Sequence, residues 1–244
     1  MTASPDHRLP EAVLRPVRGH HAFEACVEQL ATAIRLGVYP LGTVLPAERD
    51  LAERLAVSRA TLREAMAALR EAGLVETTRG RGGGTVVTLK PRLPNARRAA
   101  RLTAAQRRDW FDALEFRRIV EPGAAYLAAR TDLDDAAREQ LETALAAVTD
   151  ARRPAAHRQA DSRFHLTVAT LSDSPRVVET VTAVQATLHE MLLAIPVLGR
   201  NIDHSDRQHA AVVKAILTQD ADRARRVMEE HCDDTAALLR GLVG

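Results

Sequence analysis

The chain has 244 residues, which is enough for one large domain or two of ordinary size. Hydrophobic residues make up 46% of it and aromatic residues only 3%, so we expect a core of Ala, Leu and Val in a composition that favours helices. The formal net charge of +2 does not by itself indicate a nucleic-acid partner, and the distribution of the basic residues matters more than their sum.

The cysteines and the hydropathy pattern predict a cytoplasmic protein. Cys26 and Cys232 are too few and too far apart for a disulfide framework or a zinc finger, which fits a reducing compartment. Charged residues interrupt the N-terminal segment, so a signal peptide is not expected. No apolar stretch reaches the roughly 18 residues that a membrane span requires.

The N-terminal part begins with a polar segment, residues 1–19, whose prolines predict a disordered tail. Apolar residues then recur at helical spacing from His21 to Leu36, and Gly37 is placed to end this first helix. A second helix is expected to open near Pro46 and to end near Ala56.

The third helix is expected to follow almost at once, from the N-cap Ser58 to Ala72, with Gly73 ending it. Two helices joined by so tight a link form a helix-turn-helix. Two short strand-like runs, 74–78 and 85–88, then flank a basic turn rich in glycine, which predicts a β-hairpin wing. We therefore expect a winged helix-turn-helix over residues 20–90.

The rest of the chain shows no strand signal. Residues 91–103 predict a basic linker, and residues 104–244 an all-helical domain. Its expected helices cover residues 104–130, 134–151, 155–172, 175–198, 204–218 and 221–241. Pro122 is expected to kink or split the first of them. The predicted fold class is mainly α, with an N-terminal winged helix-turn-helix, including its small hairpin, and a C-terminal all-α bundle.

Four arginines and a threonine are placed to read DNA. Arg59, Thr61 and Arg63 occupy the start of the third helix, the part of a recognition helix that meets base edges in the major groove. Arginine can donate two hydrogen bonds to guanine or bind a phosphate. Arg49 begins the preceding helix and Arg79 lies at the wing tip. Any one of them could be a solvated surface residue, but together they favour DNA binding.

The order of these motifs resembles the signature of the GntR family. The resemblance covers residues 22–88 and rests on Leu45-Pro46-Ala47-Glu48-Arg49-Asp50-Leu51-Ala52, on Val57 to Ala65, and on Leu69 to Val75. It implies that the chain binds double-stranded DNA through six matching positions, and it adds Gly80 to the residues chosen above. These positions are Arg49, Arg59, Thr61, Arg63, Arg79 and Gly80.

The C-terminal part contains a possible set of metal ligands. Asp161 and His165 are four residues apart, so a helix places them on one face, and His209 and His231 lie on two later helices. Imidazole and carboxylate ligands suit a divalent transition metal. Spacing alone leaves open an ordinary buried polar cluster, and other histidines compete for the role.

Residues 108–240 resemble the FCD domain, the effector module of the FadR-type branch of GntR regulators. The resemblance rests on the run Glu115 to Pro122, on Asp161 to His165, on the segment around His209, and on Asp220 to His231. It implies that Asp161, His165, His209 and His231 bind a metal, usually zinc or nickel. It also implies that Arg117 binds an acidic effector, whereas the residue spacing equally allows an ion pair with Glu121. Ser174 stands where relatives often have Asn, so the identity of the effector is not inherited.

The function expected from these features is transcriptional regulation by a homodimer that binds an inverted-repeat operator under the control of a small organic acid. Two alternatives remain: a regulator for which the metal itself is the signal, and a metal-dependent hydrolase. The chain has no HExxH, GxSxG, Walker A or dinucleotide-binding motif, so catalysis is not expected.

Overall fold

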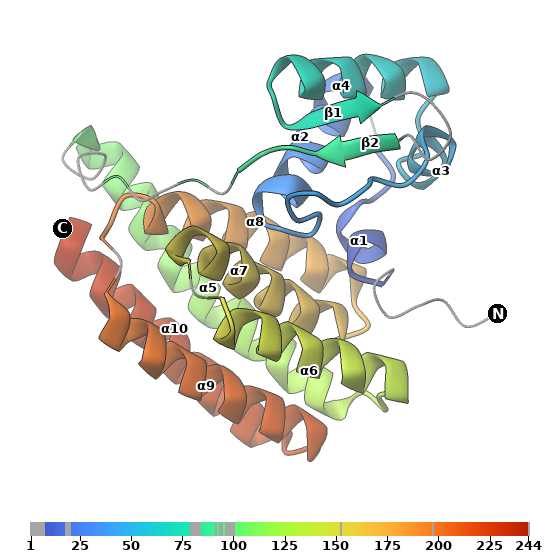
Figure 1. Ribbon diagram of the computed structural model, residues 1–244. Coiled ribbons are helices and arrows are strands. Elements are labelled where there is room, and N and C mark those ends of the chain that lie inside the picture. Colours follow the sequence, from blue (N-terminus) through green and yellow to red (C-terminus); the bar gives the residue numbers. More distant parts are fainter. Residues whose placement is uncertain are drawn as a thin grey trace. The chain divides into compact units, whose positions relative to one another are not determined.

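The computed structural model describes residues 8–17, 21–78, 84–90, 92, 95, 101–151, 153–196 and 198–243. They fall into two compact units, His7–Pro91 and Arg92–Gly244, and each is described by itself (Figure 1). Among the described residues, the first unit contains four helices and a hairpin, and the second contains helices and no strand. This is the predicted mainly α fold class. None of the helices in these ranges is long and apolar enough to span a membrane.

The N-terminal unit begins with a helix that the sequence did not predict. Its helices are α1 (Arg8–Val13), α2 (Ala22–Arg35), α3 (Glu48–Arg54) and α4 (Arg59–Glu71). The expectation of a disordered tail over residues 1–19 is therefore wrong for residues 8–17. Leu9 and Val13 lie one helical turn apart and, with Leu14, are buried. Arg54 also donates a hydrogen bond to Glu11 over 2.9 Å, so a short helix in a polar segment is held by both apolar and ionic contacts.

Helices α3 and α4 form the predicted helix-turn-helix. The hydroxyl of Ser58 accepts a hydrogen bond from the backbone N–H of Thr61, so it caps α4 as expected. Gly73 has a φ of 71°, a left-handed conformation that ends the helix. The inner face of α4, including Leu62 and Met66, is buried.

The hairpin consists of β1 (Val75–Thr78) and β2 (Gly84–Val87), which pair antiparallel with Val75 opposite Val87. Val44 forms an isolated bridge with Val86, so the extended piece before α3 lies along the hairpin. The tip of the wing, with the predicted DNA contacts Arg79 and Gly80, lies outside the described residues.

The part of the C-terminal unit that the structure describes is a bundle of six helices. They are α5 (Ala104–Arg130), α6 (Asp135–Thr149), α7 (Pro154–Thr170), α8 (Pro175–Leu192), α9 (Gly199–Leu217) and α10 (Ala221–Val243). Helix α8 ends six residues earlier than predicted, because Ile195 precedes Pro196 and a residue before proline avoids helical backbone angles. Helix α9 begins at Gly199, earlier than predicted.

Pro122 does not split α5, which continues through it to Arg130. Proline removes one backbone hydrogen bond from a helix interior. Buried residues on both sides of it, among them Arg117 and Ala125, fix the two halves in the same bundle. The helix opens with a capping box, in which Thr103 and Gln106 each accept a hydrogen bond from the other's backbone N–H.

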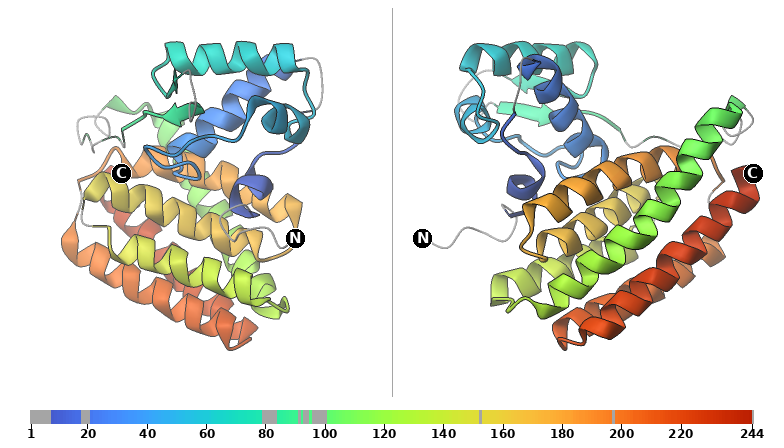
Figure 2. Two further views of the ribbon diagram at one scale, coloured as in Figure 1. Left: turned by 45° about the vertical axis from the view of Figure 1, so that its right-hand side comes forward. Right: turned by 180° about the vertical axis from the view of Figure 1, so that it is seen from behind.

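Two apolar clusters fill the bundle. The larger contains Phe164, Leu141 and Met228, and the smaller contains Leu188 and Leu239. Helix α5 packs along α10, and the view from behind in Figure 2 shows the two side by side. Buried polar side chains of α5, α7, α9 and α10 come together within this bundle.

Candidate metal centre and DNA-reading surface

Three histidines from three helices meet inside the bundle. His165 on α7, His209 on α9 and His231 on α10 are all buried, and their ligand atoms lie within 4.8 Å of one another. The ring centroid of His165 is 5.3 Å from that of His209 and 5.1 Å from that of His231. The centroids of His209 and His231 are 4.6 Å apart. The structure thus brings together three of the four residues predicted as ligands.

The fourth, Asp161, borders this cluster. It lies one turn before His165 on α7, and its Oδ1 is 3.5 Å from Nε2 of His209. Burial alone would raise the pKa of Asp161, but the neighbouring His165, His209 and Arg117 more than offset it and lower that pKa. The side chain is therefore a carboxylate at neutral pH, the form that binds a cation.

The ring nitrogens of this cluster are short of partners. Nε2 of His165 and both ring nitrogens of His209 make no hydrogen bond within the described part of the chain, whereas Nδ1 of His165 faces the carboxylate of Glu121. Burial without a partner costs about 1–3 kcal/mol for a polar group, so such atoms call for a ligand. Three imidazoles and a carboxylate form a donor set that suits zinc or nickel. The residues present therefore fit the metal that the resemblance implies.

The protonation state of the histidines also suits coordination. Burial lowers the pKa of His209 to about 3 and holds the pKa of His231 well below its usual value. Both rings are consequently neutral at pH 7. A neutral ring offers the lone pair that a metal requires.

A chain of hydrogen bonds orients His231. Its Nδ1 lies 3.2 Å from Oε1 of Gln208, whose Nε2 donates to Asp234 over 2.7 Å. His204 also contacts that carboxylate, over 2.9 Å. Because Oε1 of an amide only accepts, Nδ1 of His231 carries the hydrogen and Nε2 keeps its lone pair. Sequence reasoning missed Gln208, whose position beside His209 gives no signal of its own.

Glu121 contacts both His165 of the histidine cluster and Arg117, and so connects the two. Its Oε2 is 3.1 Å from Nε of Arg117 and 2.8 Å from Nδ1 of His165, and its Oε1 accepts a hydrogen bond of 2.6 Å from Gln185. Burial alone would raise the pKa of Glu121, but Arg117 and His165 hold it well below its usual range. The ion pair that spacing allowed for Arg117 is therefore present.

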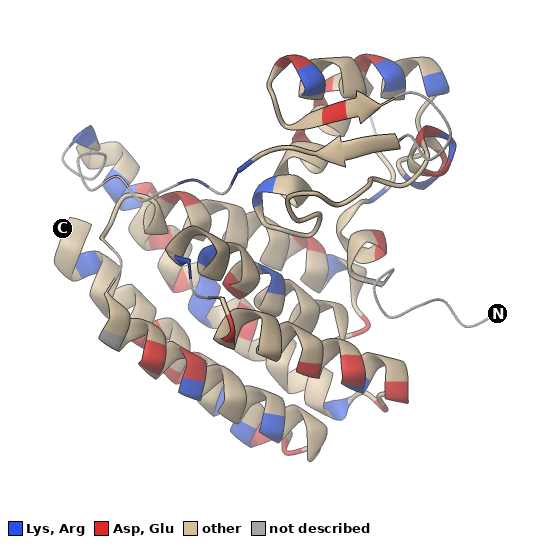
Figure 3. Cartoon of the chain, in the orientation of Figure 1, with Lys and Arg blue, Asp and Glu red and all other residues tan. Residues whose placement is uncertain are grey.

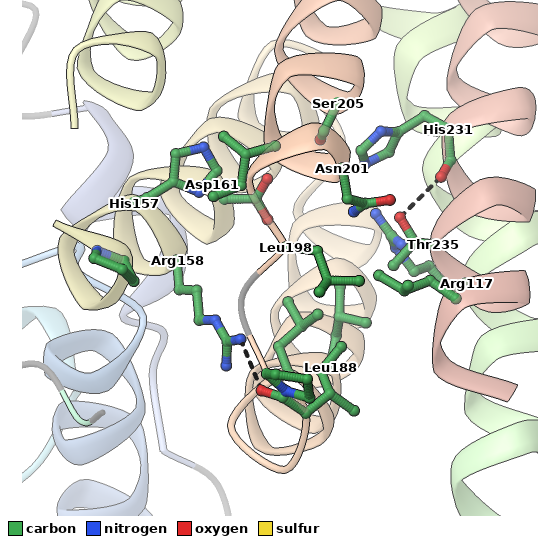
Figure 4. A pocket seen from close by; sticks show the side chains of 16 residues that line it. Arg117, His157, Arg158, Asp161, Leu188, Leu198, Asn201, Ser205, His231 and Thr235 are labelled. Carbon is green, nitrogen blue, oxygen red and sulfur yellow. Dashed lines mark hydrogen bonds between the residues drawn. The ribbon is translucent and has the colours of Figure 1, made fainter. Parts of the chain in front are cut away.

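A cavity of about 70 Å³ opens beside these groups. Arg117, Asp161 and His231 line it together with apolar residues of α8 and α10 and of the segment between α8 and α9 (Figure 4). Arg117 is 1% exposed, and its Nη1 and Nη2 have no hydrogen-bond partner among the described residues. The ion pair with Glu121 thus occupies one edge of the guanidinium and leaves the other donors free.

The predicted DNA-reading residues that the structure describes lie around α4. Arg49, Arg59 and Arg63 are exposed, and α3 and α4 carry several basic positions (Figure 3). Arg49 forms an ion pair of 3.0 Å with Asp50. Thr61 is half-buried, and its hydroxyl lies 2.9 Å from that of Ser58, so it also takes part in the helix cap.

Comparison with known protein families matches both units of the chain. Residues 23–87 match the model of bacterial regulatory proteins of the gntR family, and residues 112–234 match the FCD domain. Among solved structures, the chain resembles E. coli McbR/YncC with a TM-score of 0.55 at 16% identity, over 93% of this chain and 100% of that one. That likeness concerns the fold alone.

Several regulators are similar in sequence. A protein of Mycobacterium gastri described as the HTH-type transcriptional regulator RmpR is 33% identical, over 85% of this chain and 76% of its own. An E. coli K12 protein described as an L-lactate dehydrogenase operon regulatory protein is 34% identical over 78% and 75%, and the E. coli K12 Glc operon transcriptional activator is 29% identical over 85% of each chain. The chain therefore belongs to the GntR family with a C-terminal FCD domain, and it is a DNA-binding transcriptional regulator and not an enzyme.

Proposed function

We propose that this regulator changes its affinity for DNA when a small organic acid binds beside a divalent metal in the C-terminal unit. The observation that carries the proposal is the cavity in which a buried guanidinium with free donors, Arg117, lies next to His231 and Asp161. A buried cation with unused donors favours an anionic ligand. The size of the cavity favours an acid of few atoms, since it holds only several water molecules.

The metal would be held by His165, His209, His231 and Asp161. When bound, a divalent ion supplies a strong positive charge to which an acid group can attach. Zinc and nickel suit these ligands best. One relative is described as a regulatory protein of an L-lactate dehydrogenase operon, and an acid of the size of lactate suits this cavity.

A route from the cavity to the linker supports control of DNA binding. The segment between α8 and α9 contributes Ile195, Pro196 and Leu198 to the cavity wall. Two residues earlier than Ile195, the carbonyl oxygen of Leu193 accepts a hydrogen bond of 2.7 Å from the backbone N–H of Asn95, in the linker that leads to the DNA-binding unit. An acid that shifts this wall would shift the linker, and differential affinity for two arrangements typically gives a coupling of about 1–3 kcal/mol.

The regulator is further proposed to act as a homodimer on an inverted repeat, in the cytoplasm where DNA is available. Helix α5 exposes Phe116, Ile119 and Leu127, which are 47%, 72% and 38% exposed, and all three lie on one face of the helix. Exposed apolar faces of this kind favour association. Two winged helices would double the length of DNA that is read.

The direct test measures DNA binding with and without acid. An operator selected from random DNA is titrated with the metal-loaded regulator by fluorescence anisotropy, in the presence and absence of L-lactate and other small hydroxy acids. A change of at least fivefold in Kd with one of these acids, lost in Arg117→Met, supports the proposal. Equal affinity in all conditions contradicts it.

Nε2 of His165 and the two ring nitrogens of His209, which make no hydrogen bond among the described residues, favour one second candidate, a regulator for which the metal is the signal. In that case, addition of zinc or nickel alone to metal-free protein would change operator affinity, and acids would add nothing. The same anisotropy titration without acid separates the two functions.

A further inference from the structure

A second buried guanidinium lines the cavity of Arg117. Arg158 lies on α7, one turn before Asp161, and is 7% exposed. Its Nη2 donates a hydrogen bond of 3.3 Å to the carbonyl oxygen of Ile195, and its Nη1 has no hydrogen-bond partner in the described part of the chain.

Arg158 keeps its charge in this place. Burial lowers its pKa to about 10, and the nearby carboxylate of Asp161 limits the fall. The side chain is therefore a cation at neutral pH. A buried cation with an unused donor is costly unless an anion reaches it, and planar guanidinium groups bind carboxylates with particular strength.

The two arginines reach the cavity from different sides. Arg117 comes from α5 and Arg158 from α7, and Figure 4 shows the apolar side chains of Leu188 and Leu198 among those between them. Such an arrangement suits a short molecule with an acid group at each end, joined by an apolar carbon chain.

The net charge of the site also favours a ligand with two negative charges. Two guanidiniums, of Arg117 and Arg158, balance the two carboxylates of Glu121 and Asp161. A bound divalent ion would then leave two positive charges in excess, the number that a dianion neutralises. An acid with a single negative charge would leave one buried charge uncompensated.

We propose that Arg158 binds a second acidic group of the effector, so that the regulator responds to small dicarboxylates in preference to monocarboxylic acids of the same shape. This inference rests on the proposed function, because it assumes that the cavity takes an acid.

A purely structural role for Arg158 makes a different prediction. If the side chain only fixes the segment that contains Ile195, its removal weakens all acids alike. If it binds the second acid group, its removal weakens only ligands that have one. Comparison of a diacid with its monoamide separates the two, because the amide keeps the shape and loses one charge.

The experiment uses the metal-loaded, full-length regulator and isothermal titration calorimetry. Malonate, succinate and glutarate are each compared with their own monoamide. We expect at least one diacid to bind about ten- to a hundredfold more tightly than its monoamide, as a charge-assisted hydrogen bond of about 1.5–3 kcal/mol predicts.

Three variants complete the test. Arg158→Gln keeps an N–H donor for Ile195 and loses the charge, and it should bind diacid and monoamide equally. Arg158→Lys should retain part of the preference. Arg163→Gln removes a charge from the same helix at a residue outside the cavity lining, and it should keep the full preference.

The outcomes separate the two proposals. Equal binding of diacid and monoamide by the wild type, or a preference that survives in Arg158→Gln, overturns the role of Arg158 and leaves the effector site intact. If no diacid, no monoamide and no hydroxy acid binds the metal-loaded protein, the proposed function itself is wrong.

Discussion

Removal of Arg117 should destabilise the C-terminal unit strongly, because it leaves Glu121 as a buried carboxylate without its cation. The two side chains are 1% and 2% exposed, and Nε of Arg117 lies 3.1 Å from Oε2 of Glu121. Breaking a buried pair by removal of one partner typically costs about 3–5 kcal/mol. Glu121 keeps its hydrogen bond from Gln185, so we expect Arg117→Met to cost about 3 kcal/mol of the free energy of unfolding.

The loss of stability in Arg117→Met should depend on pH. Arg117 helps to hold the pKa of Glu121 below its unfolded value, so the stabilisation is present above the unfolded pKa of about 4.3 and is lost as the pH falls through the folded one. Without Arg117, Glu121 should accept a proton at higher pH and relieve the penalty. The difference between wild type and Arg117→Met should therefore be larger at about pH 7.5 than at about pH 4.5.

Urea unfolding of metal-free protein, followed by circular dichroism at both pH values, measures these differences. The double variant Arg117→Met, Glu121→Met is the control, since it removes both charges and should recover most of the stability. A loss below about 1 kcal/mol at neutral pH in Arg117→Met, or a double variant no more stable than the single one, would refute the assignment of a buried ion pair.

Four further predictions concern the rest of the molecule. Arg59→Ala or Arg63→Ala should each cost about 1–3 kcal/mol of operator binding relative to scrambled DNA at fixed salt, and unchanged discrimination in both would show that α4 is not the recognition helix. Because burial lowers the pKa of His209 to about 3, the unfolded chain binds more protons than the folded one between about pH 3 and 6.5. Metal-free protein should therefore lose stability as the pH falls through this range. Equal urea midpoints at about pH 7.5 and 5 would contradict this prediction. Asp234→Asn allows the amide of Gln208 to turn over and so reverses the tautomer of His231, which should weaken zinc binding about 10- to 100-fold in a competition with a chelating dye. Unaltered zinc affinity would show that the hydrogen bonds from His231 through Gln208 to Asp234 do not support the metal site. Ile119→Glu should convert a dimer to monomers in sedimentation velocity at micromolar concentration, and a sedimentation coefficient equal to that of the wild type would place the interface elsewhere.

Local signals of the sequence were sufficient for much of the N-terminal unit. Ser58 caps α4 and Gly73 ends it because N-cap chemistry and left-handed backbone depend on the residue itself. Helix α1 was missed because three prolines and many polar residues concealed the apolar spacing of Leu9 and Val13. That helix is stabilised by the burial of these side chains, which no local pattern reports.

The candidate site was predictable only where helical spacing determines it. Asp161 and His165 lie on one face of α7 because they are four residues apart, whereas their meeting with His209 and His231 followed from resemblance and not from spacing. Arg158 was not predicted, because its place in the cavity depends on how α7 packs against the segment after α8. The roles of all these residues in binding remain predictions.

Metal content tests the central claim most directly. The regulator is purified without chelator, dialysed against zinc and then against metal-free buffer, and analysed for metals beside His209→Ala. We expect about one ion per chain in the wild type and far less in the variant, because His209 is fully buried among the other ligands. Well under one ion per chain in the wild type, or equal metal content in both proteins, would contradict the metal centre.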